Sequence, residues 1–134
     1  MIKTITAKQT WKIRQEAMWP DKPLSFVQLP EDEKMLHFGF FSDDELLSVV
    51  SMLDLGSGVG KIRKLATLPI AQGYGYASEL MKTVFIFCKE QEFKIITCDV
   101  RVEKVGFYKN LGMTIEGKAF EKYDKAFVKM LINL

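Results

Sequence analysis

Leu68-Pro69-Ile70-Ala71-Gln72-Gly73-Tyr74-Gly75-Tyr76-Ala77-Ser78 is the stretch around which the chain is organised. It follows an apolar run and precedes a segment with helical spacing, so we expect a turn between a strand and a helix. Gly73 and Gly75 can adopt positive φ and carry no Cβ, which lets a ligand approach their N–H groups. The following helix adds unpaired N–H groups and the positive end of its dipole. The stretch therefore predicts a seat for an anionic group such as a cofactor phosphate, with a tight turn that binds nothing as the alternative.

Composition limits the class of protein. The 134 residues are 48% hydrophobic, enough for one domain over residues 1–134 with its own core. The net charge of +2 is too small to indicate nucleic-acid binding, so small ligands are expected. Cys88 and Cys98 lack metal-site spacing and are expected to be reduced core thiols. No apolar run approaches the ~20 residues of a membrane span and no secretory signal is visible, so we expect a cytoplasmic protein without membrane contact.

The hydrophobic pattern predicts mixed strands and helices. A capping box at Thr6 and Gln9 indicates a helix start. We expect strands over 2–5, 35–41, 45–55, 61–68, 94–100, 113–115 and 127–132, and helices over 7–18, 76–92 and 102–111. In the second helix the buried stripe is predicted to be Leu80, Thr83, Val84, Phe87 and Cys88. The strands before and after this helix form a βαβ unit and hence a parallel pair, whereas 35–41 and 45–55 form an antiparallel hairpin. Residues 21–34 read as an ordered surface loop of a kind that shapes substrate pockets.

Two motifs carry a resemblance to a known family. Leu68-Pro69 followed by Gln72-Gly73-Tyr74-Gly75-Tyr76-Ala77 resembles the central motif of the GNAT superfamily of acyl-CoA-dependent N-acyltransferases, and Phe107-Tyr108-Lys109-Asn110-Leu111-Gly112-Met113 resembles its second motif. Four further stretches look like one small, mostly uncharacterised bacterial branch: residues 14–20, 37–39, 63–67 and 116–120. The resemblance covers nearly the whole chain.

This resemblance implies a fold and a cofactor site. The fold would be α/β (mixed α+β), with a largely antiparallel twisted sheet of six to seven strands, a splayed parallel pair and three to four helices. The pyrophosphate of acetyl-CoA would sit on the N–H groups of the glycine turn and the pantetheine arm would lie along the preceding strand. The implied cofactor-binding residues are Ala66, Thr67, Leu68, Gln72, Gly73, Tyr74, Gly75, Tyr76, Ala77, Ser78, Arg101 and Tyr108. No metal is implied, and Arg101 stands where the family often has Asn.

The implied activity is transfer of acetyl from acetyl-CoA to a primary amine of a small molecule or peptide, by direct attack in a ternary complex. Tyr108 matches the family tyrosine near the CoA sulfur and is our candidate proton donor to the leaving thiolate; packing at the edge of the core is its alternative role. A pocket lined from Trp19, Phe26 and Phe38 would suit the amine. Small GNAT proteins commonly pair, which implies a homodimer. A non-catalytic acyl-CoA sensor or a protein-interaction module on the same fold is the alternative function.

No general base is identified. His37 is predicted to be a sheet histidine with satisfied ring nitrogens rather than a base, and Glu45 and Asp54 to be solvated strand ends; water could also carry the proton. Cys98 is expected to be a core thiol rather than a nucleophile. A Walker A loop would need Gly-Lys-Ser/Thr after the glycines, and the antiparallel strands upstream argue against a dinucleotide-binding fingerprint.

Overall fold

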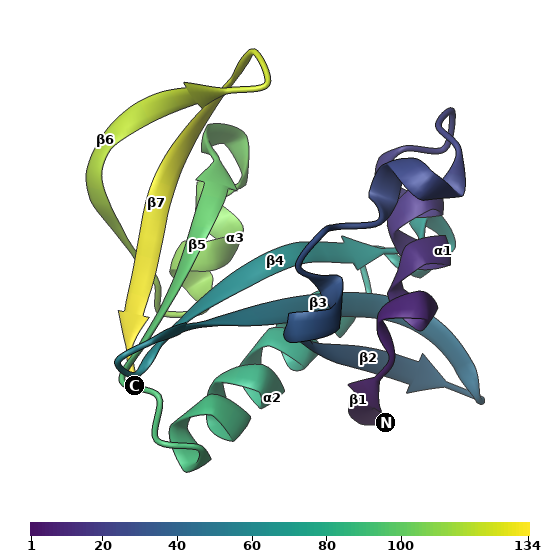
Figure 1. Cartoon of the computed structure of the whole chain (residues 1–134), viewed down its shortest axis with the longest axis horizontal. Coiled ribbons are helices and arrows are strands. Elements are labelled where there is room, and N and C mark those ends of the chain that lie inside the picture. Colours follow the sequence, from purple (N-terminus) through teal and green to yellow (C-terminus); the bar gives the residue numbers. More distant parts are fainter. The chain divides into compact units, whose positions relative to one another are not determined.

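The computed structural model describes all residues from Met1 to Leu134 and contains seven strands and three α-helices (Figure 1). The strands are β1 (Ile2–Ile5), β2 (Leu36–Ser42), β3 (Glu45–Gly56), β4 (Val59–Thr67), β5 (Ile95–Arg101), β6 (Thr114–Lys122) and β7 (Lys125–Asn133). The helices are α1 (Ala7–Met18), α2 (Tyr76–Glu90) and α3 (Val105–Asn110). The predicted numbers of strands and helices are therefore confirmed.

The strands form one mixed sheet in the order β1-β2-β3-β4-β5-β7-β6. β4 and β5 are its parallel pair, with Val59 opposite Ile95 and Ile62 opposite Cys98. The pairs β1–β2, β2–β3, β5–β7 and β6–β7 are antiparallel. The mixed, largely antiparallel sheet is thus confirmed, whereas the splay of the parallel pair stays a prediction.

Contacts within the chain divide it into two compact units. The first comprises Met1–Leu53 and Arg63–Val84, and the second comprises Asp54–Ile62 and Phe85–Leu134. The glycine turn belongs to the first unit and α3 to the second.

In the first unit, β1 leads directly into α1. The Thr6 hydroxyl accepts the Gln9 N–H at 3.3 Å and the Gln9 side-chain oxygen accepts the Thr6 N–H at 2.8 Å, which confirms the predicted capping box. Ile13 of α1 is buried together with Val49 and Ala66 of the neighbouring strands. The helix is therefore anchored at its start by hydrogen bonds and at its middle by apolar packing.

The hairpin of β2 and β3 turns through two aspartates. Asp43 and Asp44 have φ of 50° and 65°, and Ser42 pairs with Glu45 across them. Aspartate tolerates this left-handed region better than most residues, and such turns match the twist of the flanking strands. Before the hairpin, residues 21–34 contain the 3₁₀ turns Leu24–Val27 and Asp32–Lys34. The prediction of an ordered loop there is confirmed.

Helix α2 buries a stripe that differs by one position from the prediction. Leu80, Val84 and Cys88 are fully buried as expected, but Thr83 is exposed, and Met81 and Phe85 take the inner positions instead. The prediction was wrong at Thr83. The buried face of α2 includes Met81 and Phe85 next to Leu80 and Val84, and this rotation leaves Thr83 exposed.

In the second unit, β5 and β7 contribute most of the buried side chains. Ile96, Val100 and Met130 are buried, and Met113 joins them from the segment before β6. β6 runs to Lys122, well beyond the predicted 113–115, and it is exposed along most of its length. The predicted helix over 102–111 is a 3₁₀ turn, Val102–Lys104, followed by α3.

None of the helices is long and apolar enough to cross a membrane.

Candidate functional site

The glycine turn is open and left-handed at both glycines. Gly73 and Gly75 have φ of +87° and +81°, and a Cβ built at either position would meet nothing within 4 Å. α2 begins at Tyr76, and the N–H of Glu79 bonds to the carbonyl of Gly75 at 3.1 Å. The N–H groups of residues 76–78 precede that bond and belong to the first turn, where no intrahelical acceptor exists. The turn can therefore present several backbone donors to an anion.

The glycine turn is tied to the end of β4 by its own residues. The Gln72 side-chain amide donates to the Thr67 carbonyl at 3.1 Å, and the Ala71 N–H donates to the Leu68 carbonyl at 2.9 Å. Leu68 in turn donates its N–H to the Leu47 carbonyl at 2.9 Å. Gln72 therefore has a structural task, which is to hold the start of the turn against the strand.

The last residues of β4 are also fixed from β3. The Ser48 hydroxyl is fully buried and lies 2.8 Å from the Thr67 hydroxyl and 3.2 Å from the Ala66 carbonyl. Thr67 and Leu68 remain partly accessible, whereas Ala66 is buried. The strand end predicted to carry the pantetheine arm is thus held in place from the side of β3.

Aromatic side chains support the turn. Tyr76 stacks on Phe40 with ring centroids 4.3 Å apart, and Tyr74 stacks on Tyr76 at 5.6 Å. Phe40 is buried and Tyr74 is exposed, so the stack runs from the core to the surface. Sequence reasoning missed Phe40, because nothing in a strand pattern indicates which helix start it contacts.

Tyr108 lies on α3 in the second unit and is half-buried. It packs edge-to-face on Phe107 with centroids 5.0 Å apart, and its hydroxyl lies near the Cys98 side chain. Burial raises the pKa of Tyr108 well above its ordinary value, and the neighbouring Cys98 adds to the effect. The hydroxyl therefore stays protonated and able to donate.

Cys98 is a buried free thiol, as is Cys88, which confirms the core-thiol prediction. Burial, with a contribution from the Asp99 charge, raises the pKa of Cys98 to about 12. A thiol with that pKa supplies almost no thiolate at neutral pH and is a poor nucleophile. Its S–H group instead donates to the Asp99 carbonyl at 3.6 Å.

Arg101, the other predicted cofactor residue of the second unit, is exposed and forms an ion pair with Glu103 at 2.6 Å. Nearby on β5, Asp99 contacts Lys61 at 3.1 Å and Lys122 at 3.4 Å. Burial alone would raise the pKa of Asp99, but these two ammonium groups outweigh it and lower the pKa.

His37 is held in a buried network, so the prediction of a satisfied sheet histidine is confirmed. Nε2 lies 2.8 Å from the Asp32 carbonyl, which only accepts, so Nε2 carries the hydrogen; Nδ1 lies 2.6 Å from the Ser51 hydroxyl. Arg14 makes two parallel bonds of 3.0 Å to the Asp32 carboxylate and a third to Ser51. Neither ring nitrogen of His37 is therefore free to act as a base.

The Arg14–Asp32 pair itself was not predicted. Both side chains are nearly inaccessible, at 1% and 3% exposure, and the carboxylate also accepts from Trp11 and from the Leu29 N–H. Burial alone would raise the pKa of Asp32, but the bonds from Arg14, Leu29 and Trp11 lower it. Arg14 follows Ile13 on the buried side of α1, and no pattern in the sequence indicates that burial.

The remaining candidate residues lie either at exposed strand ends, on the surface or in the core. Glu45 and Asp54 are exposed strand ends, as predicted, and Asp54 caps the Gly56 N–H at 2.8 Å. Phe38 is buried in the core, whereas Trp19 and Phe26 are exposed and pack edge-to-face, 5.1 Å apart; the amine pocket expected from these three residues stays a prediction. No group of three or more His, Cys, Asp or Glu side chains is placed to hold a metal ion.

An open glycine turn before a long helix, in a mixed sheet with one parallel pair, is typical of α/β proteins that bind phosphorylated cofactors. Residues 10–134 match the family model described as "Acetyltransferase (GNAT) domain". Because this match covers most of the chain, the protein belongs to the GNAT acetyltransferase family.

Solved structures of GNAT proteins share the fold at low sequence identity. An IAA acetyltransferase from Bacillus cereus ATCC 14579 superposes with a TM-score of 0.81 at 12% identity, covering 100% of this chain and 99% of that one. The ribosomal-protein-S18-alanine N-acetyltransferase from Escherichia coli gives 0.82 at 13%, covering 99% and 92%. A GNAT family acetyltransferase from Elizabethkingia anophelis with acetyl-CoA bound gives 0.78 at 14%, covering 100% and 97%. No curated protein matches the sequence.

Proposed function

We propose that this protein transfers the acetyl group of acetyl-CoA to a primary amine of a small molecule or peptide. The observation that carries the proposal is the open glycine turn, in which Gly73 and Gly75 have positive φ with free space at their Cβ positions and which leads directly into α2. Membership of the GNAT family supports acyl-CoA as the ligand of this turn. The E. anophelis relative with the same fold has acetyl-CoA bound.

In this proposal the cofactor is held mainly by backbone. The N–H groups of residues 72–78 hold the pyrophosphate, and the pantetheine arm pairs with the strand end at Ala66, Thr67 and Leu68. Arg101 contributes a charge that it shares with Glu103.

The chemistry is a direct acyl transfer. The neutral amine attacks the thioester carbonyl, the C–N bond forms, and the C–S bond breaks as the tetrahedral intermediate collapses. The amine nitrogen loses one proton and the sulfur gains one, so the step balances without a redox partner. Because both ring nitrogens of His37 are engaged, we propose that water accepts the amine proton.

Tyr108 is proposed to donate to the leaving sulfur. The raised pKa of Tyr108 keeps its hydroxyl protonated, so the hydroxyl can donate to a sulfur placed beside it. Tyr108→Phe removes the donor while keeping the ring against Phe107. We expect kcat to fall about 100-fold, the typical worth of one positioned proton donor, with the Kd of acetyl-CoA unchanged. Unchanged turnover with intact cofactor binding would remove Tyr108 from the mechanism.

Two measurements test the proposed function as a whole. Isothermal titration with acetyl-CoA tests the site, and release of free CoA thiol over a panel of primary amines tests the reaction. Saturable binding with thiol release on at least one amine is the expected result. Binding without turnover on any amine would favour the sensor alternative, and no binding at all would exclude both. A cytoplasmic location and pairing of two copies stay predictions.

A further inference from the structure

A buried serine joins β3 to the end of β4. The Ser48 hydroxyl is fully buried and lies 3.2 Å from the Ala66 carbonyl and 2.8 Å from the Thr67 hydroxyl. A carbonyl oxygen only accepts, so the single hydrogen of the Ser48 hydroxyl goes to Ala66. The Thr67 hydroxyl then donates its own hydrogen to the Ser48 oxygen. Toward a ligand, the Thr67 hydroxyl therefore offers lone pairs only and acts as a hydrogen-bond acceptor.

This pair of hydroxyls lies on the sheet face that carries the start of α2. Ser48 is opposite Phe40 in the β2–β3 ladder, and directly opposite residues point to the same face of a sheet. Phe40 stacks on Tyr76, the first residue of α2, which places Ser48 on the α2 side. Thr67 contacts Ser48 through its hydroxyl, so that hydroxyl is on the α2 side as well. It therefore lies on the side from which the glycine turn would hold a cofactor.

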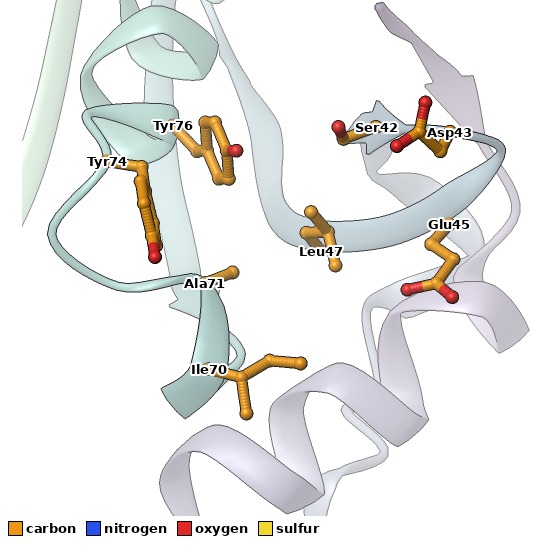
Figure 2. Close-up of a pocket in the computed structure, with 8 residues that line it drawn as sticks. All are labelled: Ser42, Asp43, Glu45, Leu47, Ile70, Ala71, Tyr74 and Tyr76. Atoms are coloured by element: carbon orange, nitrogen blue, oxygen red, sulfur yellow. The ribbon is translucent and has the colours of Figure 1, made fainter.

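An irregularity in β3 brings this part of the strand close to the glycine turn. The β2–β3 ladder skips one residue of β3, so Leu47, next to Ser48, has no partner in β2. The Leu47 carbonyl accepts the Leu68 N–H at 2.9 Å, just past the end of β4. Figure 2 shows Leu47 across a pocket from Tyr74 and Tyr76 of the glycine turn. Bulges of this kind re-aim side chains beside functional sites.

The orientation of the Thr67 hydroxyl determines the kind of group that it can bind. Thr67 is partly accessible, and its carbonyl already accepts from the Gln72 side chain at 3.1 Å. Phosphate oxygens are acceptors, so they gain nothing from a hydroxyl that can only accept. The amide N–H groups of a pantetheine arm are donors. The hydroxyl therefore suits the arm of acyl-CoA and does not suit its phosphates.

We propose that Ser48 is a positioning residue that holds the Thr67 hydroxyl as an acceptor for an amide N–H of the acyl-CoA arm. The proposal rests on the binding of acyl-CoA at the glycine turn. Ser48 itself does not touch the cofactor, because its hydroxyl is buried and both of its bonds are made within the chain. Its effect on cofactor affinity should therefore pass entirely through Thr67.

The test is a double-mutant cycle in acetyl-CoA affinity, measured by isothermal titration of the full chain. Thr67→Val removes the accepting hydroxyl, and Ser48→Ala removes the group that orients it. We expect each variant to weaken binding about threefold to tenfold, the worth of one hydrogen bond. The double variant should bind no more weakly than Thr67→Val alone, since Ser48 has no other route to the ligand. Thr67→Ser keeps the hydroxyl and should bind within about twofold of wild type.

Thr97→Val is the matched control. The Thr97 hydroxyl is also buried and donates to a strand carbonyl, that of Met130, at 3.1 Å, but it belongs to the second unit. Its loss should lower the melting temperature about as much as Ser48→Ala does and leave acetyl-CoA affinity unchanged. ADP carries the pyrophosphate without the arm, so it should bind Ser48→Ala and wild type equally.

Several results would overturn the role of Ser48. They are additive losses in the double variant, equal losses of acetyl-CoA affinity for Ser48→Ala and Thr97→Val, an equal loss of ADP affinity, and unchanged acetyl-CoA affinity in Ser48→Ala. A wild-type chain that binds no acetyl-CoA would instead contradict the proposed function, so the two failures give different results.

Discussion

The glycine turn and the segment from Asp21 to Lys34 are both irregular connections of the first unit, but they hold their shapes in opposite ways. The glycine turn is exposed and relies on backbone conformation, a short stack of rings and one side-chain bond from Gln72. The segment from Asp21 to Lys34 is held in place by the buried ion pair between Arg14 and Asp32. The glycine turn leaves backbone N–H groups for a ligand, whereas the 21–34 segment uses its buried carboxylate for bonds within the chain. We therefore expect ligand binding to depend on the glycine turn and stability to depend on the 21–34 segment.

The largest effect should come from breaking the buried pair. Asp32→Asn leaves Arg14 as an uncompensated buried charge, and we expect the free energy of unfolding to fall by about 3–5 kcal/mol. Urea denaturation measures it. The control is Glu31→Gln, which removes the neighbouring, partly exposed pair with Arg63 and should cost about 1 kcal/mol or less. Equal costs in the two variants would contradict the contrast between the two connections.

Acid should remove the same stabilisation without mutation. The folded-state pKa of Asp32 lies below its ordinary value, so its contribution is complete above that ordinary value and is lost as pH falls through the lowered folded pKa. The stability difference between wild type and Asp32→Asn should therefore be constant near neutral pH and shrink below about pH 4. The pKa of Asp99 is also lowered, but Asp99 is present in both wild type and Asp32→Asn, so its contribution cancels in the stability difference. A difference that persists unchanged at pH 3 would show that charge is not the source.

The glycine turn should respond in binding more than in stability. Gly73→Ala places a Cβ at φ of +87°, which costs about 1–2 kcal/mol of stability, and the strain should also lower acetyl-CoA affinity roughly tenfold, about the worth of one hydrogen bond. Gly56→Ala is matched, because Gly56 has φ of +88° and similar open space but lies in the β3–β4 turn. Isothermal titration should show a loss only for Gly73→Ala; a similar loss for Gly56→Ala would mean that general destabilisation explains it.

The smallest effect concerns the ring stack. Tyr76→Leu removes the stacking on Phe40, and beyond the apolar contact this should cost about 0.5–1.5 kcal/mol in thermal or urea unfolding. Tyr74→Leu should cost less, because the Tyr74 ring is 69% exposed. A larger stability loss for Tyr74→Leu than for Tyr76→Leu would show that the exposed ring contributes more to the stack than the ring packed on Phe40.

Local signals predicted much of this fold. The capping box at Thr6 and Gln9, the bounds of α1 and the start of α2 are set by residues within one turn of each other, and these predictions are confirmed. β6 was missed over most of its length because it is exposed along nearly all of its residues and has no apolar alternation to detect. β6 is defined by its antiparallel pairing with β7, which a local sequence pattern does not show.

The candidate site divides in the same way. The glycine turn is contiguous in sequence and could be predicted, including its open left-handed conformation. Arg14, Asp32 and Ser51 meet across 18 and 37 positions of sequence, and no spacing rule connects them. His37 could be assigned to a sheet but its partners could not.

The position of His37 opposite Ser51 in the β2–β3 ladder has a consequence for folding. A slip of one residue in that hairpin would turn His37 to the other face of the sheet and break its hydrogen bonds with the Ser51 hydroxyl and the Asp32 carbonyl. The hairpin can close quickly through its two-aspartate turn, but only one register lets α1 and the 21–34 segment dock with all polar groups paired. The buried network thus selects the correct strand alignment from its competitors during folding.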